Sequence, residues 1–278
     1  MIPPIASKFV AGETPAAALD HSRRLNDRDV GAILNLLGEH YDEPEAAASD
    51  RDAYLDLIDD IARIDGDICI SVKPSQIGLD IGETTFRENL EAIVERADDR
   101  GVFVWVDMED HTTTDTTLDA FEDFAREYDG GVGVCLQANL KRTLDDVKRL
   151  ADVPGKVRLV KGAYDEPETV AYTEKSRVNE AYQDLLEYAF EHYDGGIAVG
   201  SHDPEMIDYA RDLHAEHGTE FEVQMLMGVR EDAQDDLAEE YEVWQYVPYG
   251  DKWMSYFYRR VMERKENLLF ALRAVVSG

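Results

Sequence analysis

The sequence predicts an α/β protein that folds as a (β/α)8, or TIM, barrel with an extra helix at its N-terminus. Eight short runs of apolar or β-branched residues alternate with eight helical patterns along the chain, as this fold requires. The 278 residues suit one such barrel, which typically uses about 250 residues. The G-x-G-x-x-G turn of an open doubly wound sheet is absent.

The expected strands are mostly continuous apolar runs rather than alternating ones. Parallel strands that are covered on both faces have this pattern. We expect strands at residues 32–37, 68–72, 102–106, 132–136, 157–160, 197–200, 221–225 and 243–247.

The expected helices fill the segments between and after the strands. Asp115, Asp203 and Asp251 are of a residue type that caps helix starts, and Pro204 follows Asp203 as expected at a first helical position. No linker or repeat divides the chain, so residues 1–278 are expected to form a single domain. The extra helix spans 13–29, and the others span 44–64, 84–99, 114–128, 140–151, 167–190, 204–217, 230–241 and 251–276.

The charge is strongly negative. The chain has 60 Asp and Glu against 28 Lys and Arg, and its formal net charge is −32. Such a surface repels nucleic acid and anionic lipid, so we expect no nucleic-acid partner and at most transient peripheral membrane contact. Lysine is rarer than arginine among the cations. The bias predicts a salt-adapted, haloarchaeal type of protein, because molar salt screens self-repulsion; an ordinary acidic protein is the alternative.

Location and redox state follow from two further features. We find no apolar stretch of about 18 residues and no basic n-region followed by an apolar h-region. The protein is therefore expected to be cytoplasmic, with room for peripheral contact at the inner face of the cell membrane. Cys69 and Cys135 lie in apolar runs and are expected to be buried, reduced thiols.

Polar residues stand at or near the carboxyl ends of most expected strands. In a barrel these ends meet at one rim, where the following loops form the ligand site. We therefore expect a site for a polar ligand that contains Lys73, Asp107, Gln137, Lys161, Tyr164, Ser201, His202, Gln224 and Tyr246.

Arg158 lies inside an expected strand among apolar residues. A buried cation is costly unless a carboxylate or an anionic ligand meets it. A structural ion pair and a ligand-binding role are both open. Asp107 could be the partner of Arg158, or it could pair with Lys73.

The acidic residues and the histidine in 107–111 are of metal-ligand types. Consecutive strand residues point alternately in and out, which disfavours a shared metal site, and we expect no metal. A metal-dependent lyase or hydrolase that uses Asp107, Glu109 and His111 is a weaker alternative function. A barrel that only binds an amino acid or another partner through the same rim is a third.

The expected last helix carries a polar face. At 100° per residue, Tyr256, Arg259, Arg260 and Glu263 fall within an arc of about 100°. Two adjacent arginines can grip a carboxylate in a two-pronged fashion, so we favour an anion clamp. A solvated face with an Arg259–Glu263 pair gives the same spacing.

Two segments resemble the proline dehydrogenase family, the FAD-dependent enzymes that begin proline breakdown. Residues 158–164 (Arg-Leu-Val-Lys-Gly-Ala-Tyr) are similar to the family's flavin-site segment, and Tyr256-x-x-Arg259-Arg260-x-x-Glu263 is similar to its substrate-binding signature. Weaker matches in the family's order extend the resemblance over about residues 30–270. They are Leu37-Gly38-Glu39, Ser71-Val72-Lys73, Val106-Asp107-Met108-Glu109, Leu136-Gln137-Ala138 and Phe221-Glu222-Val223-Gln224-Met225-Leu226.

The resemblance implies oxidation of L-proline to 1-pyrroline-5-carboxylate in a distorted barrel whose last helix lies over the carboxyl-end rim. Arg259 and Arg260, helped by Lys73, would hold the proline carboxylate, and Tyr246 and Tyr256 would enclose the ring. A hydride would pass from proline C5 to flavin N5, and the electrons would go on to a quinone-type acceptor. Hydroxyproline or another cyclic imino acid fits the same description.

For the cofactor, the resemblance implies that Arg158 stabilises the reduced flavin and that Asp107 balances Arg158 and Lys73, so Asp107 and Arg158 would be catalytic. Asp203 departs from the family, which usually has Asn there; it would put a carboxylate near the cofactor phosphates or only cap the next helix. Besides Arg158, the residues expected to contact FAD are Met108, Gln137, Lys161, Gly162, Ala163, Tyr164, Ser201, His202, Gln224 and Glu263.

Overall fold

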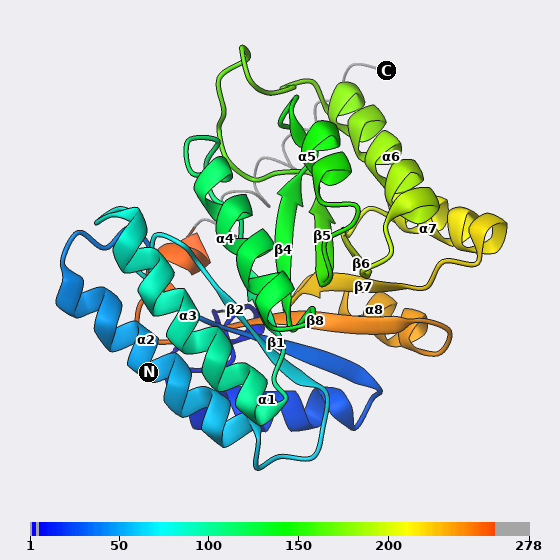
Figure 1. Cartoon of the computed structure of the whole chain (residues 1–278). Coiled ribbons are helices and arrows are strands. Elements are labelled where there is room, and N and C mark those ends of the chain that lie inside the picture. The colour runs from blue at the N-terminus through cyan, green and yellow to red at the C-terminus, as the bar shows by residue number, and fades with distance from the viewer. Residues whose placement is uncertain (1, 4–5, 259–278) are drawn as a thin grey trace.

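The computed structural model describes residues 2–3 and 6–258 and confirms the predicted barrel. Eight parallel strands form one closed sheet in chain order, with β1 paired to β8 (Figure 1). Each predicted strand agrees with an observed strand to within two residues at both ends. The strands are β1 (Val30–Leu36), β2 (Ile68–Val72), β3 (Val104–Val106), β4 (Val132–Gln137), β5 (Lys156–Val160), β6 (Ile197–Gly200), β7 (Phe221–Leu226) and β8 (Glu242–Tyr249).

Helices surround the barrel (Figure 1). Asp203 caps α7 as predicted, since its side chain accepts a hydrogen bond from the Glu205 N–H. The predicted cap at Asp115 is wrong: Thr113 takes the capping position of α4, and Asp115 bonds Arg142 from the first turn. The helices are α1 (Pro15–Asn26), α2 (Pro44–Ile61), α3 (Glu83–Arg100), α4 (Thr114–Glu127), α5 (Thr143–Arg149), α6 (Lys175–His192), α7 (Pro204–His217) and α8 (Glu231–Ala238).

The prediction of a helix from residue 167 is wrong at its start, because α6 begins at Lys175. Residues 161–174 instead form a long loop at the carboxyl end of β5. Ala171 makes an antiparallel bridge to Leu140, and Lys141 Nζ donates to the Glu168 carbonyl at 2.6 Å. These contacts pair polar groups of the loop and tie it to the segment that follows β4.

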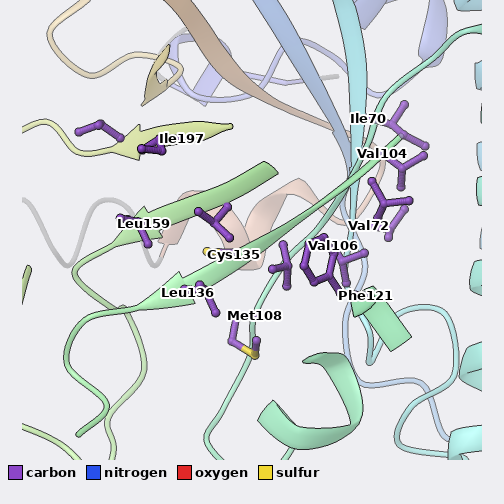
Figure 2. Packing of buried hydrophobic residues seen from close by; sticks show 14 of the residues in the cluster. Ile70, Val72, Val104, Val106, Met108, Phe121, Cys135, Leu136, Leu159 and Ile197 are labelled. Carbon is purple, nitrogen blue, oxygen red and sulfur yellow. The ribbon is translucent and has the colours of Figure 1, made fainter. Parts of the chain in front are cut away.

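Alternate residues of each strand face two different environments. Outward side chains pack under the helices in one large apolar core, part of which Figure 2 shows with Phe121 of α4 and the strand residues Val104 and Val106. Inside the barrel, Trp105 and Trp244 belong to a smaller cluster. Gly31 and Gly133 make room for these rings. A Cβ at Gly31 would lie 2.5 Å from Trp244, and a Cβ at Gly133 would lie 2.6 Å from Trp105. Both cysteines are free and buried, as predicted.

The N-terminal segment meets the described start of the last helix, residues 253–258. Phe9 and Val10 pack with Leu37 and Tyr256, and the Ala11 N–H donates to the Pro248 carbonyl at 2.9 Å. The predicted remainder of that helix, through residue 276, lies outside the described residues. In the part of the chain that the structure describes, no helix has the length and apolar character needed to cross a membrane.

Candidate active site

A cavity of about 480 Å³ lies at the carboxyl ends of the strands. Ser201 is not among its lining residues, and the predicted ligands Arg259, Arg260 and Glu263 lie outside the described residues. The cavity brings together most of the other residues that the sequence singled out: Lys73, Asp107, Met108, Gln137, Arg158, Lys161, Gly162, Ala163, Tyr164, His202, Gln224, Tyr246 and Tyr256.

Asp107 is the centre of a charged cavity floor. Directly after β3, its Oδ1 accepts from the Ser71 hydroxyl at 2.7 Å and pairs with Arg158. Its Oδ2 accepts from Lys73 Nζ at 3.1 Å and from the Tyr246 hydroxyl at 2.7 Å. Asp107 therefore forms ion pairs with both Lys73 and Arg158.

These contacts keep all three charges in place. Burial alone would raise the pKa of Asp107, but the charges of Lys73 and Arg158, with hydrogen bonds from Tyr246 and Ser71, outweigh burial and lower this pKa to about 2. Burial would lower the pKa of Lys73 and of Arg158, and Asp107 instead raises both. Two cations and one anion therefore leave the floor with one net positive charge at neutral pH.

Arg158 reaches the floor from β5 and is held on several sides. Its guanidinium carbon lies 4.9 Å from the Trp105 ring centroid and 5.6 Å from that of Tyr246, within the range of cation–π attraction. Nη1 donates to Gln224 Oε1 at 3.1 Å. The side chain is 6% exposed, so the cation is fixed in place away from solvent.

Gln137 and Gly162 shape the wall between β4 and β5. Gln137 Nε2 donates to the Glu109 carbonyl at 2.6 Å, and the Ala163 N–H donates to Gln137 Oε1 at 3.4 Å. Gly162 has φ +105°, and a Cβ there would lie 2.1 Å from Asn139 Oδ1. Glycine therefore suits the turn out of β5 and leaves backbone along the cavity.

Lys161 is the third cation of the cavity, and it is already paired. Its Nζ donates to Asn179 Oδ1 and to Asp203 Oδ2, each at 2.6 Å. Asp203 therefore both caps α7 and neutralises Lys161. The Ser201 hydroxyl accepts from the Asp203 N–H at 3.1 Å.

Aromatic and apolar residues also line the cavity. Burial raises the pKa of Tyr164 to about 12, so its hydroxyl stays protonated. Tyr256 and Met108 are largely buried and also line the cavity. His202 Nε2 accepts from the Leu226 N–H at 2.8 Å, which requires an unprotonated Nε2 and ties the loop after β6 to β7.

The residues proposed as metal ligands point to different partners. Glu109 accepts from the N–H and the hydroxyl of Ser75 at 2.6 and 2.7 Å. Asp110 accepts from a backbone N–H two residues along the chain, and His111 pairs with Glu166. Over residues 2–3 and 6–258, no group of three or more His, Cys, Asp and Glu is arranged to hold a metal ion.

Sequence reasoning missed Ser71 and Trp105 as parts of the site. Ser71 bonds the Asp107 carboxylate, and Trp105 stacks on Arg158. Trp105 lies two residues before Asp107, so strand alternation puts both side chains inside the barrel. That spacing is the signal that could have found it.

Comparison with known proteins identifies the family. The sequence profile described as "Proline dehydrogenase" matches residues 18–273. The chain belongs to the proline dehydrogenase family. This family member is 36% identical to "Proline dehydrogenase 2" of Bacillus subtilis, over 98% of this chain and 90% of that one. It is also 36% identical to "Proline dehydrogenase" of Deinococcus radiodurans, over 99% and 91% of the two chains. These matches make the protein an oxidoreductase.

Solved structures agree with this proline dehydrogenase fold. Proline utilization A of Bdellovibrio bacteriovorus, inactivated by N-propargylglycine, superposes with a TM-score of 0.86 at 24% identity, over 93% of this chain and 32% of that one. The D778Y variant of proline utilization A from Bradyrhizobium japonicum gives 0.77 at 22% identity, over 92% and 30%. The chain therefore spans about a third of the length of these solved proteins and shares the fold of that part.

Proposed function

We propose that the protein is an FAD-dependent dehydrogenase that oxidises L-proline to 1-pyrroline-5-carboxylate. The observation that carries the proposal is the buried network of Arg158, Asp107 and Lys73 on the cavity floor. Its net positive charge suits an anionic substrate next to an electron acceptor that gains negative charge on reduction. The names of the Bacillus and Deinococcus relatives support proline as the substrate.

The residues present fit FAD. Arg158 would supply positive charge for the reduced ring, and Lys161, although paired with Asp203, would lie near the phosphates. Gln137 and Gln224 would supply side-chain amides for the polar edge of the ring. Apolar side chains such as Met108 line the cavity beside them, as a flat aromatic ring requires. Backbone at Gly162 and Ala163, with Tyr164 and the segment at Ser201 and His202, would extend the site toward the phosphates and adenosine, and Glu263 would join from the last helix.

The substrate would lie between the charged floor and the last helix. Lys73 would bind the carboxylate with Arg259 and Arg260, which follow Tyr256 by three and four residues in the sequence, a spacing that would put them on the same face of a helix. Tyr246 and Tyr256 would enclose the ring. Holding the carboxylate at one end fixes the position of the opposite ring carbon, which is the main contribution of such a clamp to the rate.

Each charged residue then has a defined task. When bound, FAD supplies at N5 the acceptor for the hydride that leaves proline C5. Arg158 stabilises the negative charge that develops, and its paired, stacked position means that little reorganisation is needed. Asp107 holds Arg158 and Lys73 at fixed separation and accepts the Tyr246 hydrogen bond, which orients that ring.

We further propose a single catalytic domain over residues 1–278 and a quinone-type electron acceptor. The charge of −32 supports a cytoplasmic, salt-adapted protein that makes only transient peripheral contact with a membrane. The acceptor is tested with purified protein, L-proline and added vesicles in molar KCl. Reduction of quinone would support the proposed acceptor, and consumption of oxygen without it would contradict it.

The first experiment is the visible spectrum of protein purified in molar salt, followed by anaerobic L-proline. A flavin spectrum that bleaches supports both cofactor and substrate. A flavin that stays oxidised with proline refutes the substrate, and a protein that takes up no added FAD in molar salt refutes the whole proposal.

The carboxylate clamp is tested separately with Arg259→Met. Loss of one bidentate contact should raise the proline KM by roughly tenfold or more, while the flavin content stays that of the wild type. Lys252→Met, in the turn before this helix, is the matched control. An unchanged KM, or loss of the flavin, would contradict the assigned role.

A further inference from the structure

A continuous row of polar side chains runs through the interior of the barrel toward the cavity. At the amino end of β5, Lys156 pairs with Glu222 of β7. Gln224 Nε2 donates to Glu222 Oε1 at 2.5 Å, and Arg158 Nη1 donates to Gln224 Oε1 at 3.1 Å. Arg158 then pairs with Asp107 on the cavity floor. We call Lys156, Glu222, Gln224, Arg158 and Asp107 the barrel column.

The three middle residues of the barrel column are shielded from solvent. Glu222, Gln224 and Arg158 are exposed by 3%, 4% and 5%. Polar groups buried to this degree are bonded to each other or cost free energy. Lys156 and Glu222 are not used by the proposed chemistry, yet Glu222 is buried inside the barrel, and Lys156, whose side chain is 33% exposed, pairs with it.

The direction of the hydrogen bonds depends on Glu222. An ionised carboxylate only accepts, so the Gln224 amide must turn its NH2 toward Glu222. Its carbonyl oxygen is then left to face Arg158, which only donates. With the amide reversed, two donors would face each other at Arg158 and two acceptors would face each other at Glu222. Both neighbours therefore favour the same orientation of the Gln224 amide: Glu222 accepts from its NH2, and Arg158 donates to its carbonyl oxygen.

We propose that Glu222 is a positioning residue that fixes the Gln224 amide and, through it, the guanidinium of Arg158 beside the cofactor. Asp107 and the aromatic rings hold the rest of the guanidinium, and Gln224 is the partner of Nη1. Lys156 neutralises Glu222 and so makes its burial tolerable. The inference rests on the proposed function, because it assigns an effect on bound FAD.

The decisive variant is K156M/E222Q, which removes both charges of the pair at nearly constant volume. Charge balance in the column is preserved, but a neutral amide at position 222 accepts a weaker hydrogen bond from the Gln224 NH2 than a carboxylate does. Gln224 is then held less firmly against Arg158. We expect the equilibrium between oxidised and reduced flavin to shift about tenfold toward the oxidised form. This corresponds to a reduction potential that is lower by about 30 mV. Single-turnover reduction by L-proline should slow on the order of tenfold, with the proline KM changed by less than about threefold.

Two comparisons separate positioning from general damage. Glu242 is the strand neighbour of Glu222 in the sheet register and bonds Trp244 Nε1 at 2.7 Å, so E242Q is the matched control and should keep the wild-type potential. Gln224→Leu should reproduce the loss, and adding K156M/E222Q to it should bring no further loss. Losses that add would show that Glu222 acts independently of Gln224 and would overturn the inference.

The remaining outcomes are equally clear. If K156M/E222Q binds FAD with an unchanged reduction potential and an unchanged reduction rate, the inference fails and the proposed function stands. If wild-type protein takes up no FAD in molar salt, both fail together. FAD content and thermal unfolding of each variant, measured alongside, confirm that folded holoenzymes are being compared.

Discussion

The inside of the barrel and the layer between barrel and helices are built from alternate residues of the same strands, but they differ in kind. Outward residues such as Val104, Val106 and Leu159 form a dry apolar core with the helices. Inward residues include Arg158 and Glu222, which are also buried. The outward face of the strands buries apolar side chains, whereas the inward face buries charged side chains beside the apolar cluster that contains Trp105 and Trp244.

The difference indicates that the outward layer mainly stabilises the fold and that the inward residues mainly serve the reaction. Apolar burial is non-directional and stabilises whatever encloses it, whereas a buried charge network is specific in geometry and contributes little net stability. We therefore expect outward substitutions to have the largest effects on the free energy of unfolding and inward ones to have the largest effects on the reaction. Four substitutions test that division.

The largest effect is expected from Phe121→Ala in the outward layer. Phe121 is fully buried on α4, and its loss should destabilise the fold by about 3–5 kcal/mol through a cavity. Urea unfolding in molar KCl measures the loss, with Phe121→Leu as the milder control. The proline KM of the folded protein should stay near wild type; a large change in KM would break the comparison.

Arg158→Met, in the barrel interior, should slow the reaction strongly and change the free energy of unfolding little. Without the cation, flavin reduction by proline should slow by roughly 10²–10³-fold, as on removal of other charge-stabilising donors. Asp107 keeps Lys73, Ser71 and Tyr246 as partners, so unfolding should change far less than in Phe121→Ala. Stopped-flow absorbance gives the rate, and Arg126→Met on the surface of α4 is the control. If flavin reduction stays within threefold of the wild-type rate, Arg158 does not stabilise the charge that develops in the reaction.

The contribution of Asp107 to stability should depend on pH. Its pKa is about 2 in the folded protein, below the ordinary value of about 3.9 in an unfolded chain. Ionised Asp107 therefore stabilises the fold fully above about pH 4, and this stabilisation, roughly 2–3 kcal/mol in all, is lost as the pH falls toward 2. The gap in unfolding free energy between wild type and Asp107→Asn should narrow over that range. A gap independent of pH would contradict the assignment.

The smallest effect is expected at the Lys161–Asp203 pair on the rim, where both side chains are about a quarter exposed. Asp203→Asn keeps a good helix cap and frees Lys161 for a cofactor phosphate. FAD should then bind about two- to fivefold more tightly at low salt, since a pair of this exposure is worth at most about 1 kcal/mol. In molar KCl the difference should shrink. Fluorescence titration measures the FAD affinity at each salt concentration, with Glu205→Gln as the control. Equal affinities of wild type and Asp203→Asn at low salt would contradict the view that Asp203 competes for Lys161.

Much of this architecture could be predicted from the sequence. Continuous apolar runs are a local signal, so the strands were found within two residues of their ends. Fold geometry then gathered Lys73, Asp107 and Arg158 at one rim without knowledge of any contact. The resemblance supplied flavin and proline, which spacing alone does not encode.

Other features depend on tertiary partners and could not be read locally. The start of α6 was misplaced because residues 161–174 satisfy their polar groups through the bridge to Leu140 rather than through a helix. The double role of Asp203 requires knowing that Lys161, far away in sequence, lies beside it. The barrel column likewise depends on the pairing of β5 and β7 side chains across the interior.

Closure of the sheet by β1 and β8 has a consequence for synthesis of the protein. These strands come from opposite ends of the chain, and Ile33 pairs with Tyr246. A ribosome that has released only the first seven strands exposes a chain with Asp107, Lys73 and Arg158 but with two open sheet edges. Such edges invite pairing with other chains, and long-range pairing of this kind forms slowly. The chain is therefore exposed to pairing with other chains until β8 closes the sheet against β1.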